Sequence, residues 1–398
     1  MSVALDFDDS FWINCPSDIL ILIFKSLDIN SLINCMHVNK TWSDTVYYYC
    51  QHYNLWGKLL EKISHKNGLS YGLKSQLNDK HLFLSALNWL SIQNSHILPC
   101  HKYSIEKIRS MCMLNEMLFV TSNLSLNFID IRQKKMIKRL EHMCLEYIET
   151  RSLIAELTLP NLDVIGYNAL TLINKLHTNV CECTDVKKII LFDISLFKVH
   201  VNTCYVIDIK NVLWLYTAEE CCWDTKVLAR YYGNKESITL IHVYIDDVYV
   251  LLKTGDILKL DRKCKKFEKL LNLDIPHYLL DKELFMFHKY SLIVAVPSDK
   301  TYESYPSKEH NQSIFTCPGL TCLLEHGPVL ITGFENGMVK IFVIDKLLKN
   351  EILPALQFRL DTYMSLQSYK IIAIEVYEDN DGHHMFLATD DNICELLM

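Results

Sequence analysis

Glycine and long apolar runs are both scarce in this sequence. Only 11 of its 398 residues are glycine, so few positions could form a glycine-rich phosphate-binding loop. No apolar stretch approaches the roughly 18 residues of a membrane-spanning helix, since even Ile189–Phe192 is followed by Asp193. The first residues also lack the basic and apolar regions of a signal peptide. We therefore expect a protein of the cytoplasm, the nucleus or both, with no membrane partner.

Motifs for catalysis and metal binding are absent from the sequence as well. There is no Gly-x-Ser-x-Gly elbow and no His-Glu-x-x-His pair. The candidate metal ligands lack a matching second pair at ligand spacing: Cys181-x-Cys183, Cys221-Cys222 and His383-His384. We expect neither a metal nor another cofactor, and a protein that is not an enzyme.

The charged residues are mixed along the chain and give a net charge of −7. The densest positive stretch, residues 262–266, is short, so a nucleic-acid partner is not expected. The 15 cysteines are odd in number and scattered. This distribution favours reduced thiols over a disulfide framework.

Residues 15–42 carry the signals of three short helices. Pro16 suits a helix start, and Asn30 and Asn39 are placed to cap two further helices. The first helix contains an unbroken apolar run, Ile19–Phe24, which covers every face of the helix. A module this small has only one modest core. The remaining apolar surface must be covered by the rest of the chain or by another protein.

Residues 15–57 resemble an F-box. The matching positions are Pro16, Asp18, Ile19, Leu20, Ile23, Phe24, Leu27, Leu32, Cys35, Val38 and Trp42, followed by Leu55-Trp56. Cys15 departs from the pattern, because the family usually has leucine before the proline. The many matching positions, in order, make this resemblance more specific than a short signature.

The resemblance implies docking to the Skp-type adaptor that links such receptors to a cullin and its RING subunit. By position, the residues expected on the adaptor face are Pro16, Ile19, Leu20, Ile23, Leu27, Leu32 and Val38. Phe24, Cys35 and Trp42 are expected in the core of the module. The alternative is that all of these residues pack the module against its own C-terminal domain.

The expected fold is multidomain, α plus all-β. Its segments are an acidic flexible N-terminus at residues 1–14, a three-helix F-box at 15–57, a helical linker at 58–102 and a β-propeller at 103–398. Within the linker, Asn78 or Asp79 can cap a helix with Leu82, Phe83 and Trp89 on its apolar side.

From residue 103 onward, apolar runs alternate with turns in seven similar units. Corresponding positions run from Val120 to Ala388 at a mean spacing of about 45 residues, typical of four-stranded blades. The best unit, residues 329–345, resembles a WD-repeat hairpin with Asn336-Gly337 as its turn. The Trp-Asp and Gly-His signatures are missing, so these repeats are degenerate. The spacing favours seven blades, with six or eight left open.

The final unit reaches the end of the sequence. We therefore expect a strand near residues 103–108 to complete the last blade, because an open ring would leave unpaired edges.

Taken together, these features predict a substrate-recognition adaptor of an SCF-type E3 ubiquitin ligase, whose propeller binds an unknown protein substrate. A non-degradative scaffold is the first alternative, and a hydrolase or lyase that uses the central cavity of the propeller is the second. Candidate anchors for a partner are Tyr47-Tyr48-Tyr49, Tyr231-Tyr232, Arg230 and Arg359. The sequence identifies neither the substrate-binding residues nor the propeller face that binds.

Overall fold

A computed structural model describes most of the chain. The described residues are 15–59, 79–141, 144–158, 168–176, 187–220, 222–232, 238–244, 247–272, 285–288, 291–296, 311–316, 319–347, 349, 351–366, 369–379 and 382–398. Their contacts form two units: the first holds the described residues up to 59 together with 79–84, and the second begins at Ser85. The expected flexible N-terminus, residues 1–14, and residues 60–78 of the expected linker lie outside the described residues.

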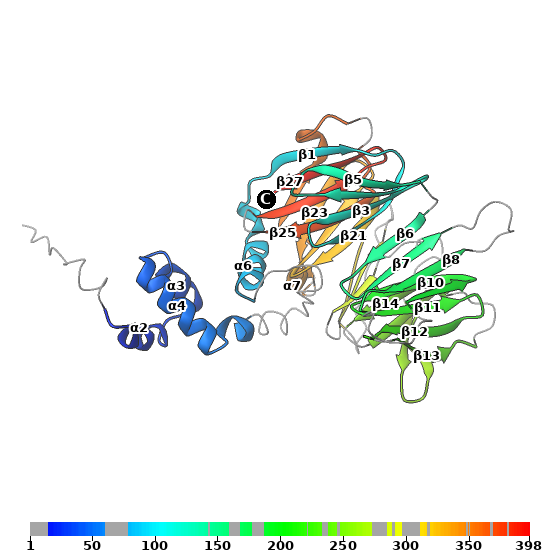
Figure 1. Cartoon of the computed structure of the whole chain (residues 1–398), viewed down its shortest axis with the longest axis horizontal. Helices are drawn as coiled ribbons and strands as arrows, with labels where there is room; N and C mark the ends of the chain where they lie inside the picture. The colour runs from blue at the N-terminus through cyan, green and yellow to red at the C-terminus, as the bar shows by residue number, and fades with distance from the viewer. Residues whose placement is uncertain are drawn as a thin grey trace, which may run out of the picture. The chain divides into compact units, whose positions relative to one another are not determined.

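Three short helices make up most of the first unit: α2 (Ser17–Phe24), α3 (Ile29–Cys35) and α4 (Lys40–His52), drawn in blue in Figure 1. Asn39 caps α4, because its side chain accepts a hydrogen bond from the Trp42 N–H at 2.9 Å. The expected cap at Asn30 is wrong. Asp28 caps α3 instead, because its Oδ1 accepts a 2.9 Å hydrogen bond from the Ser31 N–H.

One side of α2 forms the core of this unit. Leu20 and Phe24 lie four residues apart, on the same side of the helix, and are fully buried. The Phe24 ring packs edge-on against Trp42 with ring centroids 5.7 Å apart. Cys35 is buried as well. The expected core roles of Phe24 and Cys35 are confirmed, and Trp42 is half-buried.

Helix α6 (Asp79–Leu90) is the helix expected in the linker, and a 3-10 turn follows it at Ile92–Asn94. The boundary between the two units falls inside α6, after Leu84. In the first unit, the Phe83 ring packs against Trp56 at 5.8 Å. In the second unit, Trp89 and Ile92 are fully buried in a large apolar cluster.

The second unit contains six four-stranded antiparallel sheets, which we number as blades 1 to 6. Blade 1 consists of β2 (Ile108–Leu114), β3 (Met117–Ser122), β4 (Leu126–Asp130) and β5 (Lys135–Leu140). Blade 2 consists of β6 (Cys144–Glu149), β7 (Leu153–Thr158), β8 (Ala169–Asn174) and β9 (Lys188–Phe192). Blade 3 consists of β10 (Ile194–His200), β11 (Thr203–Asp208), β12 (Val212–Ala218) and β13 (Trp223–Arg230).

The remaining blades follow in chain order. Blade 4 consists of β14 (Ile238–Tyr244), β15 (Asp247–Leu252), β16 (Asp256–Asp261) and β17 (Lys266–Asn272). Blade 5 consists of β21 (Leu320–His326), β22 (Val329–Phe334), β23 (Met338–Val343) and β24 (Leu356–Arg359), with the short helix α7 (Ile344–Leu347) after β23 and a 3-10 turn at Leu360–Thr362. Blade 6 consists of β25 (Ala373–Glu378), β26 (His383–Ala388), β27 (Asn392–Leu397) and β1 (Leu98–Ser104).

The expected count of seven blades is wrong, because the described residues form six four-stranded blades. The remaining sheet has three strands, β18 (Phe285–His288), β19 (Ser291–Val296) and β20 (Asn311–Thr316). Its β19–β20 pair is parallel. A parallel pair needs a crossover connection and cannot form from a hairpin, so this sheet is not the antiparallel meander that makes a blade.

The propeller closes between its first and last strands. β1 pairs antiparallel with β27, and Tyr103 lies opposite Ile393. The expected closure is confirmed, although its strand runs over 98–104 and Ile108 already begins β2. The propeller therefore starts at Leu98, inside the segment expected to be linker.

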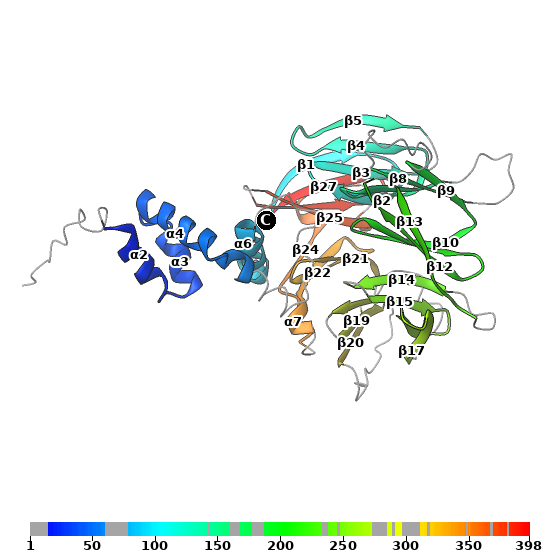
Figure 2. The same cartoon turned by 60° about the horizontal axis from the view of Figure 1, so that its bottom comes forward.

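Apolar clusters fill the space between neighbouring blades, which follow one another in Figure 2. Between blades 6 and 1, Tyr103, Phe386 and Ile129 belong to one buried cluster. Between blades 2 and 3, Leu172 and Cys204 belong to another. The blades are thus held to one another by side chains, whereas hydrogen bonds hold the strands within each blade.

The hairpin over residues 329–345 has the predicted form. Strands β22 and β23 pair, and Gly337 takes a φ of 76°, which favours glycine. A Cβ at Gly337 would also lie 2.7 Å from Tyr369 Cβ. Asn336 does not take a positive φ; its Oδ1 accepts a hydrogen bond from the Met338 N–H at 3.0 Å.

No helix among the described residues is long and apolar enough to span a membrane.

Candidate functional site

Large apolar side chains are exposed on the first unit. Ile19 is 49% exposed and Leu22 is 64% exposed, and both lie on the same face of α2 because they are three residues apart. Val38, just after α3, is 56% exposed. We call Ile19, Leu22 and Val38 the exposed apolar residues of the helical unit.

The residues expected on an adaptor face differ in how far their side chains are buried. Pro16 is exposed at the N-cap of α2, and Ile19 and Val38 are exposed. Ile23 and Leu27 are half-buried. Leu20 and Leu32 are buried at 0% and 3% exposure. A buried side chain cannot contact a partner unless the unit opens, so Leu20 and Leu32 are left out of the surface proposed below.

Sequence reasoning missed Leu22. The apolar run Ile19–Phe24 covers every face of its helix, so the pattern alone does not show which face is left exposed. The only possible signal was spacing, because Leu22 follows Ile19 by three residues. The structure distinguishes the Leu20–Phe24 side, which is buried, from the Ile19–Leu22 side, which is exposed.

An aromatic stripe runs along the exposed face of α4. Tyr47 and Tyr48 are 48% and 59% exposed, whereas Tyr49 is half-buried. The Tyr48 ring stacks on His52 at a centroid distance of 5.8 Å. Of this expected aromatic group, only Tyr47 and Tyr48 are thus available to a partner.

In the second unit, several side chains converge on the buried carboxylate of Glu378 at the end of β25. Ser85 Oγ and Trp89 Nε1, both on α6, donate hydrogen bonds to Glu378 Oε1 at 2.7 and 2.8 Å. His326 Nε2 lies 2.8 Å from the same oxygen, and His383 Nδ1 lies 3.4 Å from it. We call these five residues the Glu378 network. It fixes the second half of α6 to blades 5 and 6.

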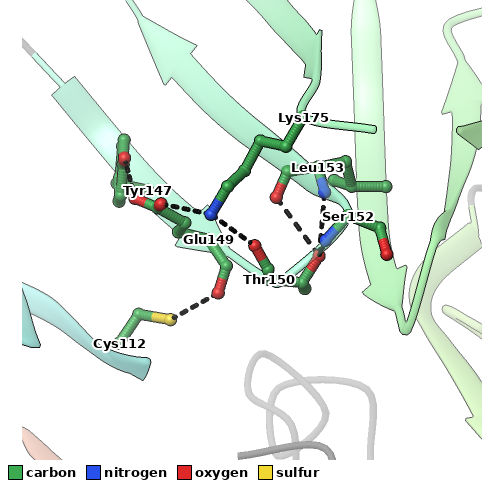
Figure 3. Close-up of polar contacts among 7 residues, drawn as sticks. All are labelled: Cys112, Tyr147, Glu149, Thr150, Ser152, Leu153 and Lys175. Atoms are coloured by element: carbon green, nitrogen blue, oxygen red, sulfur yellow. Dashed lines mark hydrogen bonds and ion pairs between the residues drawn. The ribbon is translucent and has the colours of Figure 1, made fainter. Parts of the chain in front are cut away.

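A second polar cluster lies at one end of blade 2 (Figure 3). Lys175, which follows β8, donates hydrogen bonds from Nζ to Glu149 Oε1 at 2.7 Å and to the Thr150 carbonyl at 2.9 Å. The Tyr147 hydroxyl donates to the other Glu149 oxygen at 2.5 Å. Burial, and then this hydrogen bond, raise the pKa of Tyr147 above its ordinary value.

The Thr150 side chain closes the turn beside this cluster. Its Oγ1 accepts hydrogen bonds from the N–H groups of Ser152 and Leu153 at 3.2 and 3.1 Å. Through its hydrogen bonds to Glu149 and Thr150, Lys175 connects the β6–β7 turn to the end of β8. A phenol with a raised pKa stays protonated, so Tyr147 does not supply a base. The arrangement stabilises the blade end and has no catalytic geometry.

Glu325 is a propeller carboxyl group with a raised pKa. Burial raises the pKa of Glu325, on β21, to about 8, and the charge of Lys198 on β10 opposes this shift. Such a pKa suits a general acid or base. Among the described residues, no group of three His, Cys, Asp or Glu side chains could hold a metal ion.

The family comparison decides the nature of the helical unit. The F-box domain model matches residues 12–49, which include all of α2 and α3 and most of α4. The chain contains an F-box domain, followed by a six-bladed β-propeller among the described residues. F-box domains are typically non-catalytic adaptor domains that bind Skp1-type adaptors.

Other comparisons add little to this F-box protein. A search of curated proteins finds no match. Among solved structures, the computationally designed Ika8 protein is similar with a TM-score of 0.44 and 10% identity, over 75% of this chain and 98% of that chain. A likeness this distant carries no functional argument, so function rests on the F-box and on the surfaces described above.

Proposed function

We propose that this F-box protein is a substrate receptor of an SCF-type ubiquitin ligase. Its α2 face binds a Skp-type adaptor, and through it a cullin and a RING subunit, while the propeller binds a protein substrate in the cytoplasm or nucleus. The observation that carries this proposal is the exposure of Ile19, Leu22 and Val38 on the segment that matches the F-box. The receptor itself supplies placement, because the chemistry is done by the subunits it brings together.

The exposed apolar residues give this docking a physical basis. Fully burying one such side chain is worth about 1.5–3 kcal/mol, and Ile19, Leu22 and Val38 each still expose about half of theirs. Covering all three contributes a few kcal/mol to binding. Half-buried Ile23 and Leu27 lie beside this face on and after α2 and extend it.

A non-degradative scaffold would use the same two surfaces. The two functions differ only in the fate of the propeller partner, so its abundance with and without this protein separates them. A receptor lowers that abundance in a proteasome-dependent manner, and a scaffold leaves it unchanged.

The adaptor interaction is tested by co-purification of the full chain with a Skp-type adaptor. An Ile19→Asp/Leu22→Asp variant should lose at least about tenfold in affinity, because burying unpaired charge in an apolar interface is costly. The control is Ile209→Asp/Leu353→Asp, which places the same charges at exposed apolar positions of the propeller, 62% and 80% exposed.

Circular dichroism of both variants separates lost binding from lost folding. The proposal predicts that the α2 variant stays folded and fails to bind, while the propeller variant binds like the parent. A folded α2 variant that still binds the adaptor would place the adaptor site elsewhere.

A further inference from the structure

The outer strand of blade 1 is strongly basic and exposed. Lys134, Lys135, Lys138 and Arg139 fall within six consecutive residues, and all four side chains are exposed. β5 is the last strand of its sheet and lies at the outside of the blade in Figure 2. We call residues 134–139 the basic strand.

Three cations of other outer strands form ion pairs with acids. Lys226 on β13 pairs with Asp224, Lys269 on β17 pairs with Asp256 at 2.7 Å, and Arg359 on β24 pairs with Asp361 at 2.8 Å. In the basic strand, by contrast, none of the four cations forms an ion pair with any carboxylate that the structure describes. Lys138 lies over the Phe128 ring at 5.4 Å. Asp130 lies opposite Lys135 in the sheet, so the strand has one acidic neighbour and keeps a net positive charge.

Apolar side chains are exposed between these cations. Met136 is 36% exposed and Ile137 is 51% exposed. The strand register shifts opposite Phe128 and Ile129, so that Ile137 is the extra residue of a β-bulge. Bulges on edge strands redirect side chains. Met136 and Ile137 therefore give the basic strand an apolar component beside its charges.

We propose that the basic strand docks an extended acidic segment of a protein partner. Aspartate and glutamate side chains of that segment neutralise Lys135, Lys138 and Arg139, and its apolar residues cover Met136 and Ile137. The free edge of β5 offers backbone groups to the same segment, as in recognition by strand addition.

The same charges select against a second copy of the strand. Two basic strands placed side by side repel each other, and edge lysines protect natural sheets from pairing with themselves. An acidic strand would instead be attracted by the same cations. The basic strand thus combines protection against self-association with selection for acidic partners.

This inference deepens the proposed receptor function by naming a class of partner, and it rests on that function for its biological meaning. The binding event itself does not need the adaptor. It is measured with the full chain alone and a fluorescent peptide of alternating glutamate and valine, by anisotropy at low and moderate salt.

The decisive variant is Lys135→Glu/Arg139→Glu. We expect its affinity for the peptide to fall by at least about tenfold, and the parent affinity to fall several-fold between about 50 and 300 mM salt, because exposed charges are screened. The matched control is Lys263→Glu/Lys266→Glu in the β16–β17 turn of blade 4. It makes the same change in net charge, and Lys266 lies opposite Asp261 as Lys135 lies opposite Asp130.

A second variant, Ile137→Ser, tests the apolar contribution and should weaken binding without changing the salt dependence. Equal losses in both charge variants would show a general electrostatic effect and overturn the proposal. A single-stranded DNA oligonucleotide that binds more tightly than the peptide, and loses binding in the same variant, would overturn the peptide assignment. Ile19→Asp/Leu22→Asp should bind the peptide like the parent. Loss of adaptor binding and loss of peptide binding can then be observed separately, so either proposal can fail without the other.

Discussion

At Glu378, one buried carboxylate oxygen is shared by groups from α6, blade 5 and blade 6. We expect Glu378→Gln to lower the free energy of unfolding by about 2–4 kcal/mol, because it removes a buried charge from partners that stay buried. Urea unfolding at neutral pH measures this change. Glu351→Gln is the control, since Glu351 is exposed.

The acidity of Glu378 adds a second readout to the same variant. Burial alone would raise the pKa of Glu378, but the hydrogen bonds and charges of His326 and His383 outweigh burial and hold it below the ordinary 4.5. A carboxyl group with a lowered folded-state pKa stabilises above its unfolded pKa and loses this contribution as the pH falls. The difference between parent and Glu378→Gln should therefore be complete at neutral pH and shrink below about pH 4.5. A difference that stays constant into acid would contradict an ionised Glu378.

Sequence patterns predicted some helix caps and exposed side chains correctly and missed others. Asn39 was identified as a helix cap because its side chain type and position both fit. Asp28 was missed because several polar residues lie near the start of α3, and only coordinates show which oxygen reaches the Ser31 N–H. Leu22 was missed for a similar reason, since a fully apolar helix gives no preferred face.

Among the elements, β1 is the strand that closes the propeller. Tyr103 is 7% exposed in the cluster between blades 6 and 1, and its hydroxyl lies 3.4 Å from Glu395 Oε2. We expect Tyr103→Ala to lower the free energy of unfolding by roughly 3 kcal/mol, because it leaves a cavity at the closure. Thermal unfolding is the measurement and Lys107→Ala, at an exposed position beyond β1, is the control. Equal melting temperatures for parent and Tyr103→Ala would mean that the closure contributes little.

The strands of the blades were largely predictable from the sequence, but the pairing in the three-stranded sheet of β18, β19 and β20 was not. The unit over residues 329–345 was expected as a hairpin and contains β22 and β23, because short apolar runs on either side of a turn favour strands. The apolar run Leu292–Val296 is part of β19. Its parallel partner β20 was not foreseen, since an apolar run does not show what it pairs with. That single pairing reduces the expected seven blades to six.

At the scale of the whole molecule, binding functions are assigned to two separate units. The F-box comparison covers residues 12–49 of the first unit, and the basic strand belongs to the second. The sequence predicted the F-box because this domain has many matching positions in a fixed order. It did not identify the basic strand, because positive charge counted along the chain does not show which cations are paired with acids in the fold.

A receptor must hold both partners at once, which gives the last prediction. An immobilised Skp-type adaptor should retain the acidic peptide only when this F-box protein is present. Ile19→Asp/Leu22→Asp and Lys135→Glu/Arg139→Glu should each abolish retention, the first by losing the adaptor and the second by losing the peptide. Because these residues lie in different units, each variant should leave the other affinity within about twofold of the parent. Competition between adaptor and peptide for the free protein would show that the two surfaces are not independent, and a bridging receptor would then be excluded.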